Sequence, residues 1–125
     1  MRVDCQWGLS GARQPADVAI IVDVLSFSTS VTVAVERGAP VFPFWGEHAE
    51  ALAATIGGRA ASKTRTRDAP SLSPASLANA CAGEALVLSS LNGARCALAA
   101  GAEHVFCGTL RNAAAVAKIA AEAGD

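Results

Sequence analysis

Three short polar segments of the chain carry the side chains that could do chemistry. They cover residues 23–30, 89–93 and 108–112, and each follows an apolar stretch and precedes an alanine-rich one. Their hydroxyl, amide, carboxylate and guanidinium groups suit the binding of oxyanions and of hard divalent cations. In a parallel sheet, turns of this kind gather along one edge, where ligands bind. The sequence therefore predicts an anion-binding α/β domain.

Asp23 is the only charged residue in the apolar run from Val18 to Leu25. An isolated buried carboxylate is costly, so this side chain needs a partner or a metal ion. At the carboxyl end of a strand it would face the ligand crevice. There it could bind Mg²⁺, which takes one or two carboxylates together with waters and substrate oxygens. The alternative is that Asp23 only braces the turn that follows.

Four hydroxyl groups follow Asp23 within a single turn, on Ser26, Ser28, Thr29 and Ser30. Capping of the next helix needs one of them, so the excess favours binding of a phosphate or sulfonate at the helix N-terminus. Ordinary capping remains the alternative. The segment is not a P-loop, because the glycines and the lysine of that motif are missing.

The second and third segments repeat the theme. Asn92 could donate its amide to an oxyanion or hold a metal-bound water, and Arg95 follows one turn into the next helix. Thr109, Arg111 and Asn112 come after the last apolar stretch. Arginine forks match phosphate and sulfonate geometry, although a surface position is the alternative for Arg95.

The elements that must position these side chains alternate along the chain. We expect strands over residues 3–7, 18–25, 40–45, 85–89 and 104–107, and helices over residues 28–38, 47–56, 73–81, 94–100 and 112–123. This order predicts a single α/β domain over residues 1–125, a three-layer α/β/α fold with a mostly parallel sheet. Residues 8–15 and 57–70 are expected to be loops, and the basic run at residues 63–67 is either a solvated loop or a lid over an acidic substrate.

Composition excludes several classes of protein. A hydrophobic fraction of 52% argues against disorder, and a net charge of −1 gives no general attraction to nucleic acid or to an anionic membrane. The N-terminus lacks a signal peptide, and no apolar run reaches the ~18 residues of a membrane span, so we expect a cytoplasmic protein. The four cysteines match no zinc pattern and are expected to be buried free thiols.

The polar segments resemble motifs of the 2-phosphosulfolactate phosphatase family. In that family a strand ends in Asp-Val-Leu-Arg-Ala-(Ser/Thr)-(Ser/Thr), a later strand runs into Thr-Asn-Gly-(Thr/Ser)-Arg-Ala, and a further one runs into Gly-Ser-(Leu/Phe)-x-Asn-Ala. The matching segments here are residues 23–29, 90–95 and 108–113, with an Asn/Leu-Ser-Pro segment at residues 72–77 between them. The order and spacing agree from about Val3 onward, and the chain resembles the N-terminal part of the longer family members.

The resemblance implies Mg²⁺-dependent hydrolysis of a phosphate monoester next to a sulfonate, which yields sulfolactate and phosphate in coenzyme M biosynthesis. It implies a metal or acid–base role for Asp23 and a catalytic role for Asn92. It also implies that Asn92, Gly93, Thr109 and Asn112 line the site. Together with the chemistry of the three turns, this gives the expected substrate-binding residues: Ser26, Ser28, Thr29, Ser90, Gly93, Arg95, Thr109, Arg111 and Asn112. The expected partner is a small phosphorylated or sulfonated acid, with no nucleic acid or membrane, and exposed sheet edges would favour a homo-oligomer.

Three positions depart from the family pattern. Ser26 stands where the family has an arginine, Leu91 where it has a threonine, and Ala94 where it has a hydroxyl residue. These departures leave a second interpretation open, a non-catalytic module that binds a small anion or serves as a partner surface. A nucleotide-binding Rossmann domain is disfavoured, because no glycine-rich fingerprint follows a strand.

Overall fold

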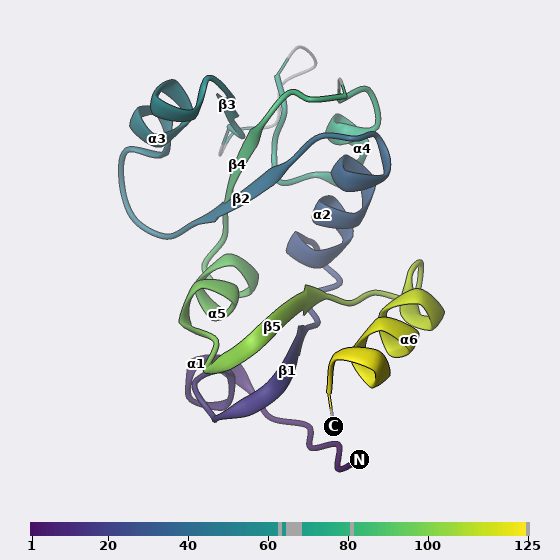
Figure 1. Ribbon diagram of the computed structural model, residues 1–125. Helices are drawn as coiled ribbons and strands as arrows, with labels where there is room; N and C mark the ends of the chain where they lie inside the picture. Colours follow the sequence, from purple (N-terminus) through teal and green to yellow (C-terminus); the bar gives the residue numbers. More distant parts are fainter. Residues whose placement is uncertain (63, 65–68, 81, 125) are drawn as a thin grey trace.

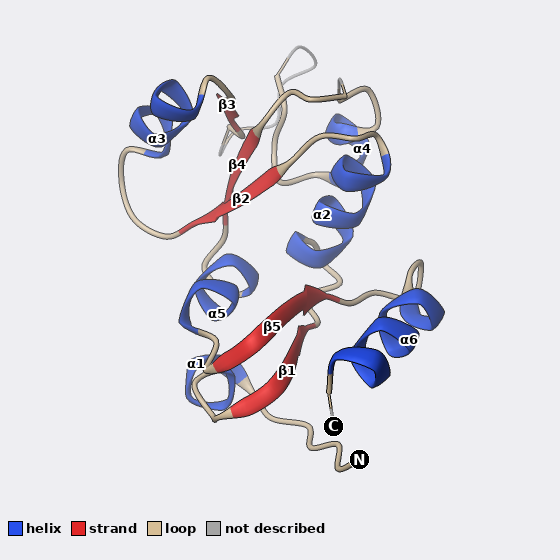
Figure 2. Cartoon of the chain, in the orientation of Figure 1, coloured by secondary structure: helices blue, strands red, loops and turns tan. Residues whose placement is uncertain are grey.

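The structure is a computed structural model that describes residues 1–62, 64, 69–80 and 82–124. Strands and helices alternate along most of the chain, as an α/β fold requires (Figures 1 and 2). In chain order the elements are α1 (Gly8–Ala12), β1 (Ala16–Ile21), α2 (Phe27–Glu36), β2 (Val41–Phe44), α3 (Ala49–Ile56), β3 (Arg59–Ala60), α4 (Pro74–Leu77), β4 (Leu86–Ser89), α5 (Gly93–Ala99), β5 (Ala102–Cys107) and α6 (Ala113–Ala123).

The strands form two parallel sheets. Strand β1 pairs with β5, and β4 lies between β2 and β3 in a three-stranded sheet. Helices flank each sheet on both sides, with α2 and α4 opposite α3 around the larger sheet and α1 and α5 opposite α6 around the smaller one (Figure 1). The expected α/β class, the parallel pairing and the layers are confirmed. The strands are divided between two sheets, whereas the sequence suggested one.

Helices α2 and α5 join the two sheets. Helix α2 contacts both β2 and β5, and α5 contacts β1, β2 and β4. The split was not predictable because hydrophobic periodicity reports which faces of a strand are buried, and it does not report which strands are neighbours. Each sheet is therefore held by helices as well as by its own ladder.

The buried core lies where α2 and α4 pack against β4. Phe27, at the start of α2, is its largest side chain and is 1% exposed. Residues 86–88 of β4 are fully buried, as is typical of a parallel strand covered on both faces. The core cluster consists of Phe27, Ala34, Ala39, Leu77, Leu86, Leu88 and Ala94.

Two helices end at the glycines that the sequence marks as stops. Gly38, after α2, has φ +84°, and the N–H of Ala39 donates to the carbonyl of Ala34 at 3.1 Å. Gly57, after α3, has φ +68°. Glycine adopts this left-handed conformation without a Cβ penalty, so both ends are fixed by local chemistry.

Four local expectations were wrong. Residues 3–7 do not form a strand: they pair with no described strand, and Trp7 is 88% exposed. A five-residue alternation is too short to specify a strand without a neighbour. Helix α1 replaces part of the loop expected over residues 8–15 and packs on α5. Strand β3 forms within the loop expected over residues 57–70 and pairs with β4. The helix expected over residues 73–81 ends at Leu77.

Other expectations fall partly outside the described chain. Residues 63 and 65–68, which hold most of the basic segment, are not described, so the lid stays untested. Cys5 is exposed, contrary to the expected burial, while Cys96 and Cys107 are half-buried free thiols and Cys81 is not described. No described helix is long and apolar enough to cross a membrane.

Candidate active site

A hydrogen bond joins the first two polar turns. Asp23 lies two residues beyond the end of β1, and its Oδ2 accepts the backbone N–H of Gly93 at 3.0 Å. Gly93 is the first residue of α5, which follows β4. The strand expected over residues 18–25 ends at Ile21, so Asp23 lies just beyond its carboxyl end, where it is half-buried and has a backbone partner for one carboxylate oxygen.

Ser28 holds Asp23 in place. Its hydroxyl donates to the carbonyl of Ile21 at 2.7 Å and accepts the backbone N–H of Asp23 at 3.0 Å, while its own N–H donates to the Asp23 carbonyl at 2.8 Å. The Ser28 side chain is completely buried. These three bonds close the turn between β1 and α2 and fix the direction in which the carboxylate leaves the backbone.

The remaining hydroxyls of this turn also donate to backbone carbonyls. Thr29 donates to Val24 at 2.6 Å, and Ser26 and Ser30 donate to Leu72 at 2.8 and 2.7 Å. A hydroxyl has one proton, so a group that gives it to a carbonyl has none left for a phosphate oxygen. In this structure the hydroxyls shape the turn and tie α2 to the Ser-Pro segment, and their role in binding substrate stays a prediction.

The second turn combines one packed residue with one exposed residue. A Cβ on Gly93 would lie 2.4 Å from Cδ1 of Phe27, so only glycine fits against that ring. Ser90 accepts the backbone N–H of Ala94 at 2.7 Å and thereby caps α5. Asn92 is exposed, and its amide has no hydrogen-bond partner in the described part of the chain. Asn92 is thus the group beside Asp23 that is available to a ligand.

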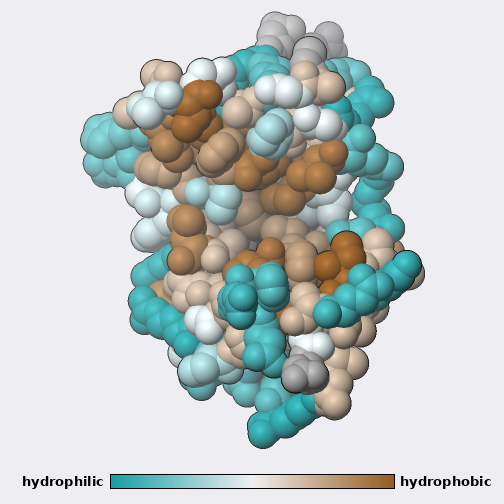
Figure 3. Space-filling view, viewed as in Figure 1, coloured by the Kyte–Doolittle hydropathy of each residue, from teal (hydrophilic) through white to brown (hydrophobic). Residues whose placement is uncertain are grey.

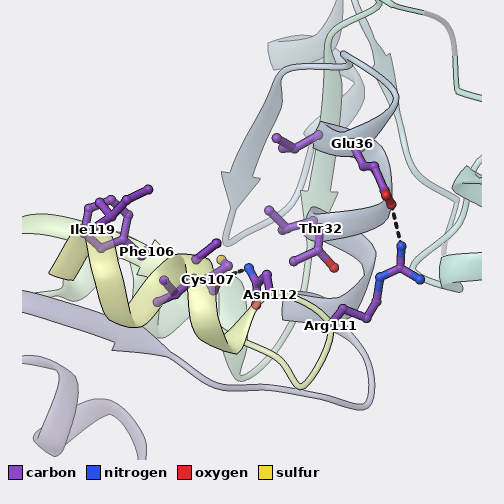
Figure 4. A pocket seen from close by; sticks show the side chains of 11 residues that line it. Thr32, Glu36, Phe106, Cys107, Arg111, Asn112 and Ile119 are labelled. Atoms are coloured by element: carbon purple, nitrogen blue, oxygen red, sulfur yellow. Dashed lines mark hydrogen bonds and ion pairs between the residues drawn. The ribbon is translucent and has the colours of Figure 1, made fainter.

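The third turn is closed by its own side chains. Oδ1 of Asn112 accepts the N–H of Thr109 at 2.8 Å and its hydroxyl at 3.2 Å, and Nδ2 donates to the carbonyl of Cys107 at 2.9 Å. Arg111 extends toward α2 and forms an ion pair with Glu36 (Figure 4). Thr109 and Asn112 therefore brace this turn, and Arg111 already has an anionic partner.

Cys107 connects the third turn with the first. It is the last residue of β5 and lies beside Ile21 of β1 in the sheet register. Burial raises the pKa of its thiol, the neighbouring Ser28 side chain acts in the opposite direction, and the charge of Asp23 raises it further. The thiol therefore stays protonated, and the charge of Asp23 acts on this thiol at the end of β5.

A cavity of about 650 Å³ opens beside the third turn, between α2 and α6. Apolar side chains border the hollow that crosses this face of the molecule (Figure 3). Arg111 and Asn112 line it, whereas Asp23, Asn92 and Gly93 do not. Burial of a phosphate dianion among side chains such as Val31, Phe106 and Ile119 would be costly. We therefore place the candidate active site at the Asp23–Asn92 edge and not in this cavity.

The donor set at this edge fits Mg²⁺ held partly by water and substrate. Among the residues that the structure describes, no three His, Cys, Asp or Glu side chains come together as a complete metal cage. Mg²⁺ commonly needs only one or two carboxylates, with waters and phosphate oxygens completing its shell. Oδ1 of Asp23 accepts no hydrogen bond from a described residue, and the Asn92 amide oxygen lies one residue from Gly93, which contacts Asp23.

Comparison with known proteins decides the family. The model of the 2-phosphosulpholactate phosphatase family matches residues 8–125. The chain belongs to this family. Membership implies phosphatase activity and agrees with the resemblance seen in the polar segments. No curated protein and no solved structure shows significant similarity to the chain.

For a phosphatase of this family, two groups near the site were not found from the sequence. Phe27 supplies the surface against which Gly93 packs, and Trp45 stacks on Arg95. The role of Phe27 could not be predicted, because the sequence does not distinguish it from any other apolar residue of a core. Trp45 could have been found, because it is an aromatic residue directly after a strand at the ligand edge.

Proposed function

We propose that the chain is a Mg²⁺-dependent phosphatase that hydrolyses a small phosphate monoester of the 2-phosphosulfolactate type to sulfolactate and phosphate. The observation that carries this proposal is the hydrogen bond from the Gly93 N–H to Asp23. It brings a carboxylate and the exposed amide of Asn92 together at the carboxyl ends of parallel strands. Family membership supports the reaction class.

Asp23 would act through its second carboxylate oxygen. Oδ2 is engaged by Gly93, so Oδ1 is the atom that either holds the metal or accepts a proton from the attacking water. When bound, Mg²⁺ would neutralise charge on the phosphoryl oxygens. The water oxygen forms a bond to phosphorus as the bond from phosphorus to the ester oxygen breaks. The leaving alkoxide takes up a proton, which gives the alcohol and inorganic phosphate.

Asn92 would stabilise the charge that develops on the phosphoryl group. Its amide is exposed beside Asp23 and donates to no described residue, so it can donate to a phosphoryl oxygen without first breaking another bond. Arg95, two residues beyond Gly93, supplies a positive charge on the same turn. The test is phosphate release from phosphosulfolactate and other phosphate monoesters, with Mg²⁺ and with a chelator. Turnover that depends on Mg²⁺ supports the proposal, and no turnover by the folded, metal-replete protein overturns it.

One observation favours a second candidate, a non-catalytic anion-binding module. Ser26 stands at the position of the family arginine, and its proton goes to the carbonyl of Leu72. The turn has therefore lost a cation that would clamp an anion. The Asp23→Asn variant separates the two candidates, with binding of inorganic phosphate measured by calorimetry. A binder keeps or gains affinity when this negative charge is removed, whereas an enzyme loses turnover.

The remaining proposals concern assembly and location. Each polar turn exposes a leucine, with Leu25, Leu91 and Leu110 at 94%, 72% and 92% exposure. Exposed apolar side chains around a site, together with open sheet edges, support self-association. We therefore keep the homo-oligomer as a proposal, to be measured by light scattering on the eluted protein. A cytoplasmic location and a role in coenzyme M biosynthesis also remain proposals.

A further inference from the structure

Trp45 and Arg95 form a cation–π pair at the edge of the larger sheet. The guanidinium carbon of Arg95 lies 4.8 Å from the centre of the Trp45 ring. Trp45 directly follows β2, and Arg95 is in the first turn of α5. Arginine commonly stacks flat on an aromatic face, which fixes the plane of the guanidinium while leaving the N–H groups on its edge available.

The pair lies at the same edge as the candidate active site. Phe44, the last residue of β2, is in register with Ser89, the last residue of β4, so Trp45 and Ser90 leave the sheet at the same level. Gly93, two residues before Arg95, contacts the carboxylate of Asp23. The backbone therefore gathers Trp45 and Arg95 with Asp23 at one end of the parallel strands.

The charge of Arg95 is not neutralised by a described residue. Arg2, Arg59 and Arg111 each form an ion pair with a carboxylate, whereas the described neighbours of Arg95 include no carboxylate within 4.0 Å. Arg95 stacks on the uncharged ring of Trp45, which is 45% exposed. An oriented cation with its N–H edge available, beside the amide of Asn92, is complementary to an oxyanion.

We propose that Trp45 is a positioning residue that holds Arg95 to bind the sulfonate of the substrate. Asp23 and Asn92 would then serve the phosphoryl group, and Arg95 would orient the substrate from its other end. This inference rests on the proposed function for its catalytic consequence. The binding of a sulfonate by Arg95 does not depend on turnover, so it is tested separately.

Binding is measured first by fluorescence. The chain has two tryptophans, so the Trp7→Phe variant leaves Trp45 as the single reporter. This protein is titrated with ethanesulfonate at constant ionic strength. We expect a saturable change in Trp45 emission that is lost in Arg95→Gln and kept in Arg2→Gln, a matched change at an arginine paired with Asp4. An equal response in Arg95→Gln, or no saturable response at all, overturns the proposal.

Kinetics tests the positioning role. In Trp45→Ala we expect KM for phosphosulfolactate to rise about tenfold with kcat nearly unchanged, and Trp45→Phe, which keeps an aromatic face, to restore most of the affinity. Phe42→Ala removes an exposed ring from the same strand and should leave KM unchanged. A fall in kcat with unaltered KM contradicts the proposal. If the parent protein hydrolyses nothing, the proposed function fails while the fluorescence result still judges the Arg95 site.

Discussion

Asp23 and Gly93, 70 positions apart in the chain, meet through a hydrogen bond of 3.0 Å from the Gly93 N–H to Oδ2 of Asp23. The bond links the turn after β1 to the start of α5, and thus the smaller sheet to the helix that follows the larger one. It also leaves Oδ1 as the carboxylate oxygen without a described partner. The placement of this one oxygen is the basis of the proposed chemistry.

The Gly93→Ala variant should be destabilised. Gly93 does not have a positive φ, so alanine is acceptable to the backbone, but its Cβ would lie 2.4 to 2.7 Å from three atoms of the buried Phe27. Overpacking of this kind costs about 1–3 kcal/mol. Chemical denaturation measures the loss. In the double variant with Phe27→Leu the two costs should be less than additive, and strict additivity would show that the clash is not the cause.

Ser28→Ala should cost more stability than Ser30→Ala. Both hydroxyls are fully buried, but Ser28 serves the carbonyl of Ile21 and the N–H of Asp23, whereas Ser30 serves only the carbonyl of Leu72. Ser28→Ala leaves the Asp23 N–H without a described partner, which costs about 1–3 kcal/mol, whereas in Ser30→Ala the Leu72 carbonyl still accepts the hydroxyl of Ser26. Ser28→Ala should also lower kcat, because Asp23 loses its brace. Equal losses of stability in the two variants would argue against the bracing role.

Cys107 should react slowly with thiol reagents until the pH is well above the usual range for a thiol. Burial, with the charge of Asp23, raises its pKa, so little thiolate forms near neutral pH. Cys5, which is exposed, should be alkylated first. Peptide mass spectrometry after timed alkylation identifies the order, and rapid labelling of Cys107 in the folded protein would contradict its burial.

The same raised pKa predicts how stability depends on pH. The folded state disfavours the thiolate of Cys107, so its contribution is fully present below the pKa of the unfolded thiol and is lost as pH rises through the folded pKa. The stability difference between the parent and Cys107→Ala should therefore be constant at neutral pH and shrink under alkaline conditions. If this stability difference instead grew with pH, folding would lower the pKa of Cys107 and contradict the expected direction.

Arg111→Gln should have a smaller effect on KM than Arg95→Gln. Arg111 pairs with Glu36 beside an apolar cavity, whereas Arg95 has no described carboxylate partner and lies near Asp23 in the fold. The pair with Glu36 is half-exposed, so its loss should change stability by less than about 1 kcal/mol. Substrate titrations on the two variants give the comparison, and a larger KM effect at Arg111 would move the binding site to the cavity.

The sequence predicted much of the fold because local chemistry decides it. Glycines 38 and 57 end their helices as expected, and the apolar run of β4 is buried as its composition indicates. The split into two sheets was not predicted, because pairing depends on how α2 and α5 pack between strands and not on any one strand's pattern. Residues 3–7 alternate like a strand yet find no described partner.

The three polar turns were recognised from the sequence, but the hydrogen bonds within and between them were not. Asp23 was expected to need a partner or a metal ion because it is a lone carboxylate in an apolar run, and the structure shows the Gly93 N–H as a partner. The hydroxyls were counted as surplus donors, but each that the structure places donates to a backbone carbonyl. Such bonds join residues as distant as Ser30 and Leu72, so no local reading of the turn could find them. The pair of Trp45 and Arg95 is likewise a tertiary contact.

The most direct test of the central claim is the rate of phosphate release from phosphosulfolactate by Asp23→Asn in the presence of Mg²⁺. Asp17→Asn is the matched control, because Asp17 is an exposed carboxylate on β1, away from the strand's carboxyl end. We predict that Asp23→Asn loses at least about 100-fold in kcat while it folds normally and Asp17→Asn keeps the parent rate. Unchanged turnover in Asp23→Asn would contradict the assignment of Asp23 as the residue that carries the reaction.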